Sequence, residues 1–353
     1  MSTPSTSLPP NAPMTNGVAS GHGEADVTAT ENSQIDSGGA SSLQNVCAGL
    51  HAQVQAFLSS SPPDEVTKRT QDQTRTAMGV VEKALRDYQF EHVSLSYNGG
   101  KDCLVLLILY LSVLHAHFTQ QQQLPAAKNN SRKTNSEAEI PLQPFPQSIP
   151  SIYAKPPDPF PAVTSFVEYS ARVYHLDLAH ISTNPGPNKK QRSHSNPPLT
   201  HPPPKFNDLQ QNHDLPEAKP TISFRDAFAL YLDANPQVHA IFVGTRRTDP
   251  HGGHLTHFDA TDHNWPTFMR VHPVIDWHLE EIWCFLRSPY LKDLEDGGPL
   301  RYCAMYDEGY TSLGGVNDTV RNPRLKYHDE KGEERYRPAY EMKHDEGERL
   351  GRE

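Results

Sequence analysis

The chain has few cysteines and no long apolar run, and both shortages restrict what it can be. Its four cysteines lie far apart, with no C-x-x-C pair, and the last is Cys303. This spacing fits neither the common zinc frameworks nor a disulfide pattern, and is typical of a reducing compartment. The longest apolar run, Cys103 to Leu114, is interrupted by Tyr110 and Ser112 and is shorter than the ~18 residues of a membrane span. We therefore expect a core helix here and no membrane partner.

Basic residues are scarce at the start of the chain, where the first is Lys68. A mitochondrial presequence needs arginines, and a signal peptide needs a basic start followed by an apolar stretch. Neither is present, so we expect a cytoplasmic protein. Over 353 residues, 32 Lys and Arg against 42 Asp and Glu give a formal net charge of −10. Because no basic stripe is visible, no nucleic-acid partner is expected.

Polar, proline-rich sequence occupies several long segments, in keeping with 32 prolines and a mean hydropathy of −0.67. Residues 1–40 are rich in Ser, Thr, Pro, Gly and Asn, which predicts a disordered tail. Two low-complexity inserts are predicted at about 119–148 and 183–220. They interrupt a single domain that we expect to span 41–353.

Between these segments, apolar strands alternate with amphipathic helices. The residue patterns predict strands at 91–96, 149–154, 176–181 and 240–245. They predict helices over 43–57, 78–88, 160–174 and 224–234. This alternation is typical of an α/β fold with a mostly parallel, twisted sheet and helices on both faces. The C-terminal segment is expected to be irregular.

The most informative stretch joins the first strand to the core helix and reads Ser96-Tyr97-Asn98-Gly99-Gly100-Lys101-Asp102-Cys103. Adjacent glycines adopt backbone angles closed to other residues, so their N–H groups can converge on an anion at the start of a helix. Lys101 adds a cation, and Asp102 adds a carboxylate that can hold Mg²⁺ beside a phosphate. A bare Gly-Gly turn before a helix would equally fit an ordinary tight turn.

The whole stretch resembles the PP-loop of the ATP pyrophosphatase superfamily, whose usual form is Ser-Gly-Gly-Lys/x-Asp-Ser. Asn98 replaces the first Ser and Cys103 the last. The stretch does not match the Walker pattern, which needs four residues between its glycines. The resemblance implies cleavage of ATP between the α and β phosphates, with this loop holding the pyrophosphate. The predicted ATP- and phosphate-binding residues of the loop are Ser96, Asn98, Gly99, Gly100, Lys101 and Asp102.

A second loop, Arg246 to Pro250, directly follows the strand at 240–245. Ligands of parallel sheets lie beyond the carboxyl ends of the strands, so this loop and the PP-loop are predicted to face one cleft. The two guanidiniums can clamp phosphates, and Asp249 can serve a metal or a substrate. An isolated Arg-Arg pair would instead favour a salt-bridged surface turn.

Further stretches follow at Thr261 to Pro266, Arg270 to Trp277, Tyr302 to Gly314 and Thr319 to Pro323. Together with Asn-Gly-Gly-Lys-Asp-Cys they resemble the eukaryotic FAD synthetases (FMN adenylyltransferases) in their fungal form. The resemblance covers roughly 91–118, 149–182 and 221–353. It implies a nucleotidyltransferase that converts FMN and ATP into FAD and pyrophosphate with Mg²⁺, by direct attack of the FMN phosphate on the α-phosphorus.

The resemblance also implies roles for single residues. The catalytic residues would be Asn98, Asp102, Asp249 and Arg349, with Asp102 as the magnesium ligand. Arg247 and Arg352 would bind phosphate, and Asp249, Asp262, Trp265 and Arg270 would bind FMN. A carboxylate such as Asp262 can accept from the flavin ring N–H, and Trp265 can stack on the ring. Without the resemblance, Trp265 would be an ordinary partly buried aromatic, and the last arginines a frayed terminus.

Two other functions stay open. A sulfonucleotide (PAPS) reductase has this loop and fold but needs a nucleophilic Cys in a C-terminal Glu-Cys-Gly motif, whereas Cys303 lies in Tyr-Cys-Ala-Met. A non-catalytic flavin or nucleotide sensor would bind without turnover, and only an activity measurement separates it from the synthetase. In either case we expect small-molecule ligands and a monomer.

Overall fold

The computed structural model describes residues 41–123, 144–184, 222–262 and 264–352. The residues from Ser41 onward form one compact unit. The predicted tail at 1–40 and most of the two predicted inserts lie outside the described residues. The helix before the first predicted insert continues to Gln123, past the predicted boundary at about 119.

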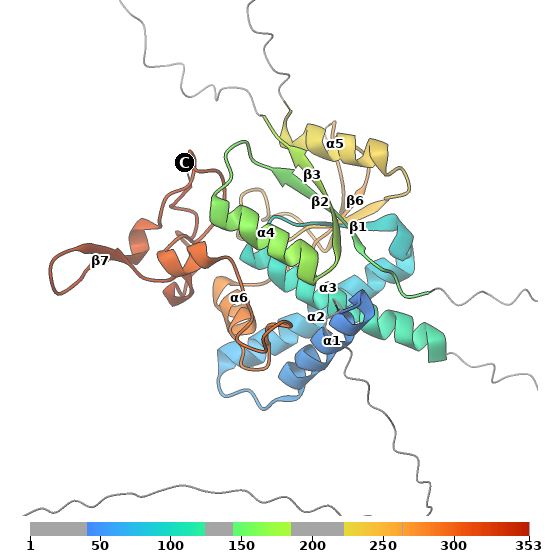
Figure 1. Cartoon of the computed structure of the whole chain (residues 1–353), viewed down its shortest axis with the longest axis horizontal. Helices are drawn as coiled ribbons and strands as arrows, with labels where there is room; N and C mark the ends of the chain where they lie inside the picture. Colours follow the sequence, from blue (N-terminus) through green and yellow to red (C-terminus); the bar gives the residue numbers. More distant parts are fainter. Residues whose placement is uncertain (1–40, 124–143, 185–221, 263, 353) are drawn as a thin grey trace, which may run out of the picture. The chain divides into compact units, whose positions relative to one another are not determined.

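A six-stranded sheet forms the centre of the unit, in the order β3-β2-β1-β4-β6-β5 (Figure 1). All neighbouring strands pair in parallel except β5 and β6, which are antiparallel. The predicted α/β class with a mostly parallel sheet is therefore confirmed. The short strands β5 and β6 were not predicted. The strands are β1 (Val93–Ser96), β2 (Ile149–Lys155), β3 (Leu176–Ser182), β4 (Ala240–Phe242), β5 (Phe258–Ala260) and β6 (Met269–Val271).

Side-chain alternation along the strands divides the core into two layers, one on each face of the sheet. Val93 and Phe242 belong to the larger apolar cluster, whereas Ile241 belongs to the smaller one. Ser94 points toward the smaller cluster, where its Oγ lies 2.7 Å from the hydroxyl of Tyr231 in α5 (Phe224–Ala234). Helix α5 thus covers one face of the sheet, opposite the other helices (Figure 1).

The larger cluster contains the long helix α3 (Lys101–Gln123). Among the described residues, α3 is the one helix long and apolar enough to cross a membrane by length and composition. Its residues 104–111 are fully buried, and it packs on three neighbouring helices. This burial agrees with the predicted core helix. The neighbours are α1 (Leu43–Ser59), α2 (Glu65–Tyr88) and α6 (Leu279–Leu286), and α4 (Pro161–Val173) packs on the same face.

Helix α2 begins thirteen residues before the predicted start at 78, since Asp64 caps it by accepting from the Thr67 N–H at 2.7 Å. Its first turns are polar, so their sequence carries no strong apolar period.

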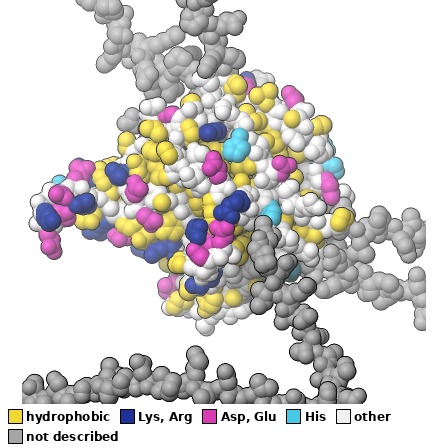
Figure 2. Space-filling model, in the orientation of Figure 1, with side chains coloured by type: hydrophobic (Ala, Val, Ile, Leu, Met, Phe, Trp, Pro, Cys, Tyr) yellow, Lys and Arg dark blue, Asp and Glu magenta, His cyan; other side chains and the backbone are white. Residues whose placement is uncertain are grey.

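After α6 the chain is irregular, as predicted, with short 3-10 turns and one small hairpin. The elements are η3 (Ala304–Glu308), η4 (Pro323–Leu325), β7 (Lys326–His328), β8 (Glu334–Tyr336) and η5 (Ala339–Glu341), while η1 (Phe90–His92) precedes β1. The hairpin carries side chains of both charges, and Figure 2 shows the two signs interspersed over this face of the molecule.

Candidate active site

The PP-loop leaves the carboxyl end of β1 and enters α3. Gly99 has φ +76°, and a Cβ there would lie 2.9 Å from Cγ2 of Val167, so both conformation and space require glycine. The Asn98 side-chain oxygen accepts a hydrogen bond from the Gly100 N–H at 2.9 Å. Asn98 therefore shapes the loop directly. Ser96, the last residue of β1, is half-buried.

The Lys101 side chain turns away from the loop into the protein. Its ammonium group contacts Asp102 at 3.0 Å and also Glu348, and its side chain is 2% exposed. Burial lowers the pKa of Lys101, but Asp102 and Glu348 outweigh it and leave the pKa raised. Its backbone N–H donates to the Tyr306 hydroxyl at 2.9 Å. Lys101 lines the PP-loop cavity, as expected for a residue of the loop, but its ammonium group is held by two carboxylates.

Arg246 is the second buried cation, with a side chain 1% exposed. Its Nε lies 2.8 Å from Asp102 Oδ1 and its Nη1 lies 2.9 Å from Asp345 Oδ1, while Nη2 bonds Glu348. The contact with Asp102 is an ion pair without the alignment of a hydrogen bond. We call these five residues, Lys101, Asp102, Arg246, Asp345 and Glu348, the buried ion network.

Buried charges persist in proteins only when they are paired. In the network both the cations and the carboxylates have partners of opposite charge. Burial raises the pKa of Asp102, but Arg246 and Lys101 outweigh it, so that the pKa lies below the ordinary value. The pKa of Arg246 is raised because Asp102 and Glu348 outweigh its burial. Lys101, Asp102 and Arg246 therefore stay charged at neutral pH.

Asp249 follows β4 and faces the PP-loop. Its Oδ2 accepts from the Arg246 N–H at 2.8 Å, and its Oδ1 lies 4.0 Å from Nη1 of Arg349. Burial and the neighbouring charge of Asp102 raise the pKa of Asp249. A cavity of about 120 Å³ lies between these groups. All four predicted catalytic residues line it: Asn98, Asp102, Asp249 and Arg349.

The end of β4 and the start of α3 approach closely beside this cavity. A Cβ on Gly244 would lie 2.8 Å from Cys103 Sγ and 2.9 Å from the Cys103 backbone nitrogen, so only glycine allows the approach. Burial and the charge of Asp102 raise the pKa of Cys103 to about 12. The PP-loop cysteine is therefore a neutral thiol at physiological pH.

Two predicted phosphate ligands lie elsewhere. Arg247 points away from the cavity, where its Nε lies 2.6 Å from Asp276 Oδ1 and its Nη1 donates to the Leu255 carbonyl at 2.7 Å. Arg352 donates to the Leu313 carbonyl at 2.6 Å and lies 3.5 Å from Asp318. Arg246, one residue before Arg247, takes the buried position, and Arg352 holds the loop after Leu313 in place.

The predicted FMN residues, apart from Asp249, gather around the β5–β6 hairpin. Arg270 donates to the Ala260 carbonyl at 3.2 Å, which braces the hairpin. Asp262 is exposed, and its carbonyl accepts from the Trp265 N–H at 3.1 Å, so the two share one turn. The half-buried Trp265 ring lies 6.0 Å from that of Phe228 in α5. These three residues lie outside the lining of the PP-loop cavity.

Sequence reasoning missed four residues that build the site: Arg246, Tyr306, Asp345 and Glu348. Arg246 was visible as half of the Arg-Arg pair, but the sequence does not tell which arginine faces inward. Glu348 lies next to the predicted Arg349, so the C-terminal motif pointed to the right segment. Contacts between Glu348 and Lys101 span 247 positions of the chain, and no local pattern reports them.

Comparison with known proteins places the chain in a family. The family model for the phosphoadenosine phosphosulfate reductase domain matches residues 92–321. A probable FAD synthase of Schizosaccharomyces pombe is 30% identical over 303 residues, covering 86% of this chain and 87% of that protein. The flavin adenine dinucleotide synthase of Saccharomyces cerevisiae is 32% identical over 235 residues, covering 66% of this chain and 60% of that protein.

Solved structures share the fold. The Candida glabrata FMN adenylyltransferase in complex with FAD and inorganic pyrophosphate superposes with a TM-score of 0.64 at 23% identity, covering 88% of this chain and 97% of that one. Yeast FAD synthetase in complex with FAD gives a TM-score of 0.62 at 24% identity, covering 89% and 100%. With the family model and the long alignment to the S. pombe protein, these results show that the chain belongs to the phosphoadenosine phosphosulfate reductase domain family, among its FAD synthases.

Proposed function

We propose that this protein is an FMN adenylyltransferase, which transfers the adenylyl group of ATP to FMN and yields FAD and pyrophosphate. The observation that carries the proposal is the cavity where Asn98, Asp102, Asp249 and Arg349 meet. The S. pombe relative, aligned over most of both chains, is named a probable FAD synthase. The C. glabrata enzyme of the same fold has been solved with FMN and an ATP analogue.

The reaction needs no nucleophile from the protein. An FMN phosphate oxygen attacks the α-phosphorus of ATP, the bond from this phosphorus to the oxygen that bridges to the β-phosphate breaks, and pyrophosphate leaves. The chain contributes positioning and charge neutralisation. Lys101 and Arg246 are engaged by carboxylates, so the exposed Arg349 on the cavity wall is the cation placed to meet phosphate.

The carboxylates at the cavity fit a magnesium ion. Mg²⁺ in such sites is bound through one or two carboxylates together with substrate phosphates. Asp102 and Asp249 line the same cavity, and the charge of Asp102 raises the pKa of Asp249. A divalent cation would relieve this repulsion. When bound, Mg²⁺ supplies charge stabilisation to the phosphates of ATP.

The PP-loop cysteine and the last cysteine of the chain argue against the sulfonucleotide reductase alternative, because that chemistry needs a thiolate. Burial raises the pKa of Cys103 to about 12 and that of Cys303 to about 11. Both remain protonated at neutral pH. All four cysteines are free thiols, which supports a reducing compartment, and we propose a cytoplasmic monomer.

The test is incubation of the purified protein with FMN, ATP and Mg²⁺, followed by chromatography of FAD and measurement of pyrophosphate. We expect equal amounts of both products, and none when riboflavin replaces FMN. Flavin or ATP binding without turnover would instead establish the sensor. The variant Asp102→Ala should stay folded and lose adenylation, and normal FAD output from it would remove Asp102 from the proposed site.

A further inference from the structure

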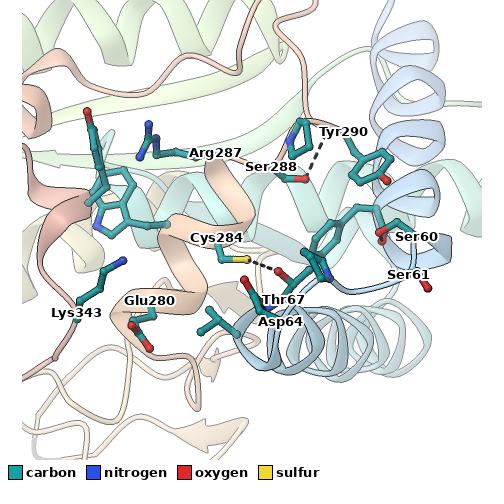
Figure 3. Close-up of a pocket in the computed structure, with 16 residues that line it drawn as sticks. Ser60, Ser61, Asp64, Thr67, Glu280, Cys284, Arg287, Ser288, Tyr290 and Lys343 are labelled. Atoms are coloured by element: carbon teal, nitrogen blue, oxygen red, sulfur yellow. Dashed lines mark hydrogen bonds between the residues drawn. The ribbon is translucent and has the colours of Figure 1, made fainter.

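A second cavity, of about 580 Å³, lies between the start of α2, helix α6 and η5 (Figure 3). Its volume falls within the range of about 300–1,000 Å³ that is usual for small-molecule sites. It has no lining residue in common with the PP-loop cavity. Four of its wall residues are aromatic: Phe57, Trp283, Tyr290 and Tyr340. Such walls suit a flat organic molecule.

The cavity is lined by two acidic and two basic residues, which differ in their contacts. Its two acidic residues already have partners: Glu280 lies 3.5 Å from Nη2 of Arg69, and Asp64 caps α2. Its two cations, Arg287 and Lys343, are exposed, and neither has an ion pair with a carboxylate of the described residues. These two cations are therefore available to a negatively charged ligand, while the lining as a whole carries no net charge.

The two cations lie at one end of the cavity. Figure 3 shows Arg287 and Lys343 on one side of Cys284, with Ser60, Ser61 and Tyr290 on the other side. The Arg287 guanidinium lies 3.5 Å from the centre of the Tyr340 ring. The contact with the ring uses the planar face of the guanidinium and leaves its N–H groups able to donate hydrogen bonds. Two such N–H groups match two oxygens of a phosphate.

We propose that this cavity binds the phosphate monoester of a planar heteroaromatic nucleoside, in a site separate from the PP-loop. Arg287 and Lys343 take the phosphate, and the ring lies along the aromatic wall toward Phe57. Trp283, on the cavity wall, packs its ring edge-on at 5.2 Å against Tyr306. The Tyr306 hydroxyl accepts from the Lys101 N–H at 2.9 Å.

Cys284 provides a direct reporter of occupancy. It lines the cavity and is half-exposed, whereas the other three cysteines are buried. A thiol reagent should therefore modify Cys284 first in the native protein. We expect saturating AMP or FMN, tested separately to identify the base that fits, to slow this modification at least fivefold. Inorganic phosphate should protect weakly, because it lacks the ring.

The double variant Arg287→Ala/Lys343→Ala should abolish the protection, while Lys292→Ala/Lys331→Ala, a charge-matched change at exposed lysines outside the cavity lining, should keep it. Thermal unfolding establishes that both variants are folded. The proposal is overturned if neither AMP nor FMN slows the modification, or if the Arg287/Lys343 variant is protected as well as the wild type. The rate of Cys284 modification does not depend on FAD synthesis. This experiment therefore tests ligand binding to the cavity even if the protein does not synthesise FAD.

Discussion

Glu348 is the carboxylate on which the buried ion network depends, and its removal is the sharpest test of that network. Its side chain is 5% exposed and bonds both Lys101 and Arg246, whose side chains are 2% and 1% exposed. Loss of one partner of a buried pair costs roughly 3–5 kcal/mol. Asp102 and Asp345 would still face the two cations, so we expect Glu348→Ala to lose about 3 kcal/mol, the lower end of that range.

Urea unfolding at neutral pH measures this loss. Glu348→Gln keeps the shape and one acceptor oxygen, so it should fall between the wild type and Glu348→Ala. The contacts of Thr311 and Asn322 go to the Glu348 backbone carbonyl, so neither variant removes them. The matched control is Glu346→Ala, whose side chain is 89% exposed and lies 3.9 Å from Arg324; it should change stability by less than ~0.5 kcal/mol. A loss below ~1 kcal/mol for Glu348→Ala, set against the cost expected for a buried pair, would refute the network as described.

Three further predictions follow from the same structure. Arg246→Ala should cut FAD synthesis at least tenfold and lower stability, whereas Arg247→Ala should keep most activity; equal effects in a kinetic assay would contradict the opposite orientations of the two side chains. Gly99→Ala should lower the free energy of unfolding in urea by at least about 1–2 kcal/mol, because Gly99 has a positive φ and a Cβ there would press on Val167. It should also lower kcat. Unchanged stability and kcat would show that the loop tolerates a side chain. Burial lowers the pKa of His272 to about 4. Between pH 6.5 and 4 this side chain is therefore protonated in the unfolded state but neutral in the folded state. The free energy of unfolding should fall by about 3 kcal/mol as the pH drops through this window. His272→Leu should remove this part of the pH dependence in urea titrations at pH 7 and 4, and an identical pH dependence would reject the assignment.

The sequence predicted those parts of the fold that local patterns encode. The strands near Val93 and Ile149 are mostly buried, whereas the strand near Leu176 alternates between exposed and less exposed residues. At four to seven residues each, these strands are long enough for their apolar or alternating residues to stand out. Strands β5 and β6 have three residues each and pair antiparallel, too short to show a period. The early start of α2 was missed because the buried residues of its first turns, Thr70, Gln71 and Thr74, are polar and show no apolar period.

The site was predictable at the level of loops but not of side-chain direction. The PP-loop and the loop with Asp249 were expected to face one cleft because both follow strand ends, and the structure brings Asn98, Asp102, Asp249 and Arg349 to one cavity. Whether a lysine or arginine points toward a ligand depends on which carboxylates pack nearby. For Lys101 one of the two carboxylates, that of Glu348, is 247 positions away.

The buried ion network changes which groups must neutralise the phosphates of the substrates. Lys101 and Arg246 carry two positive charges, but they face the carboxylates of Asp102, Asp345 and Glu348. The network therefore adds no net positive charge to the cavity, and Asp249 adds a further carboxylate there. A nucleoside triphosphate would be repelled by these carboxylates. Within the described part of the chain, Arg349 is the one cationic side chain on the cavity wall outside the network. We therefore expect the affinity for ATP to change more steeply with the concentration of a divalent cation than with ionic strength. The divalent cation would offset the carboxylates that the buried ion network places beside the cavity.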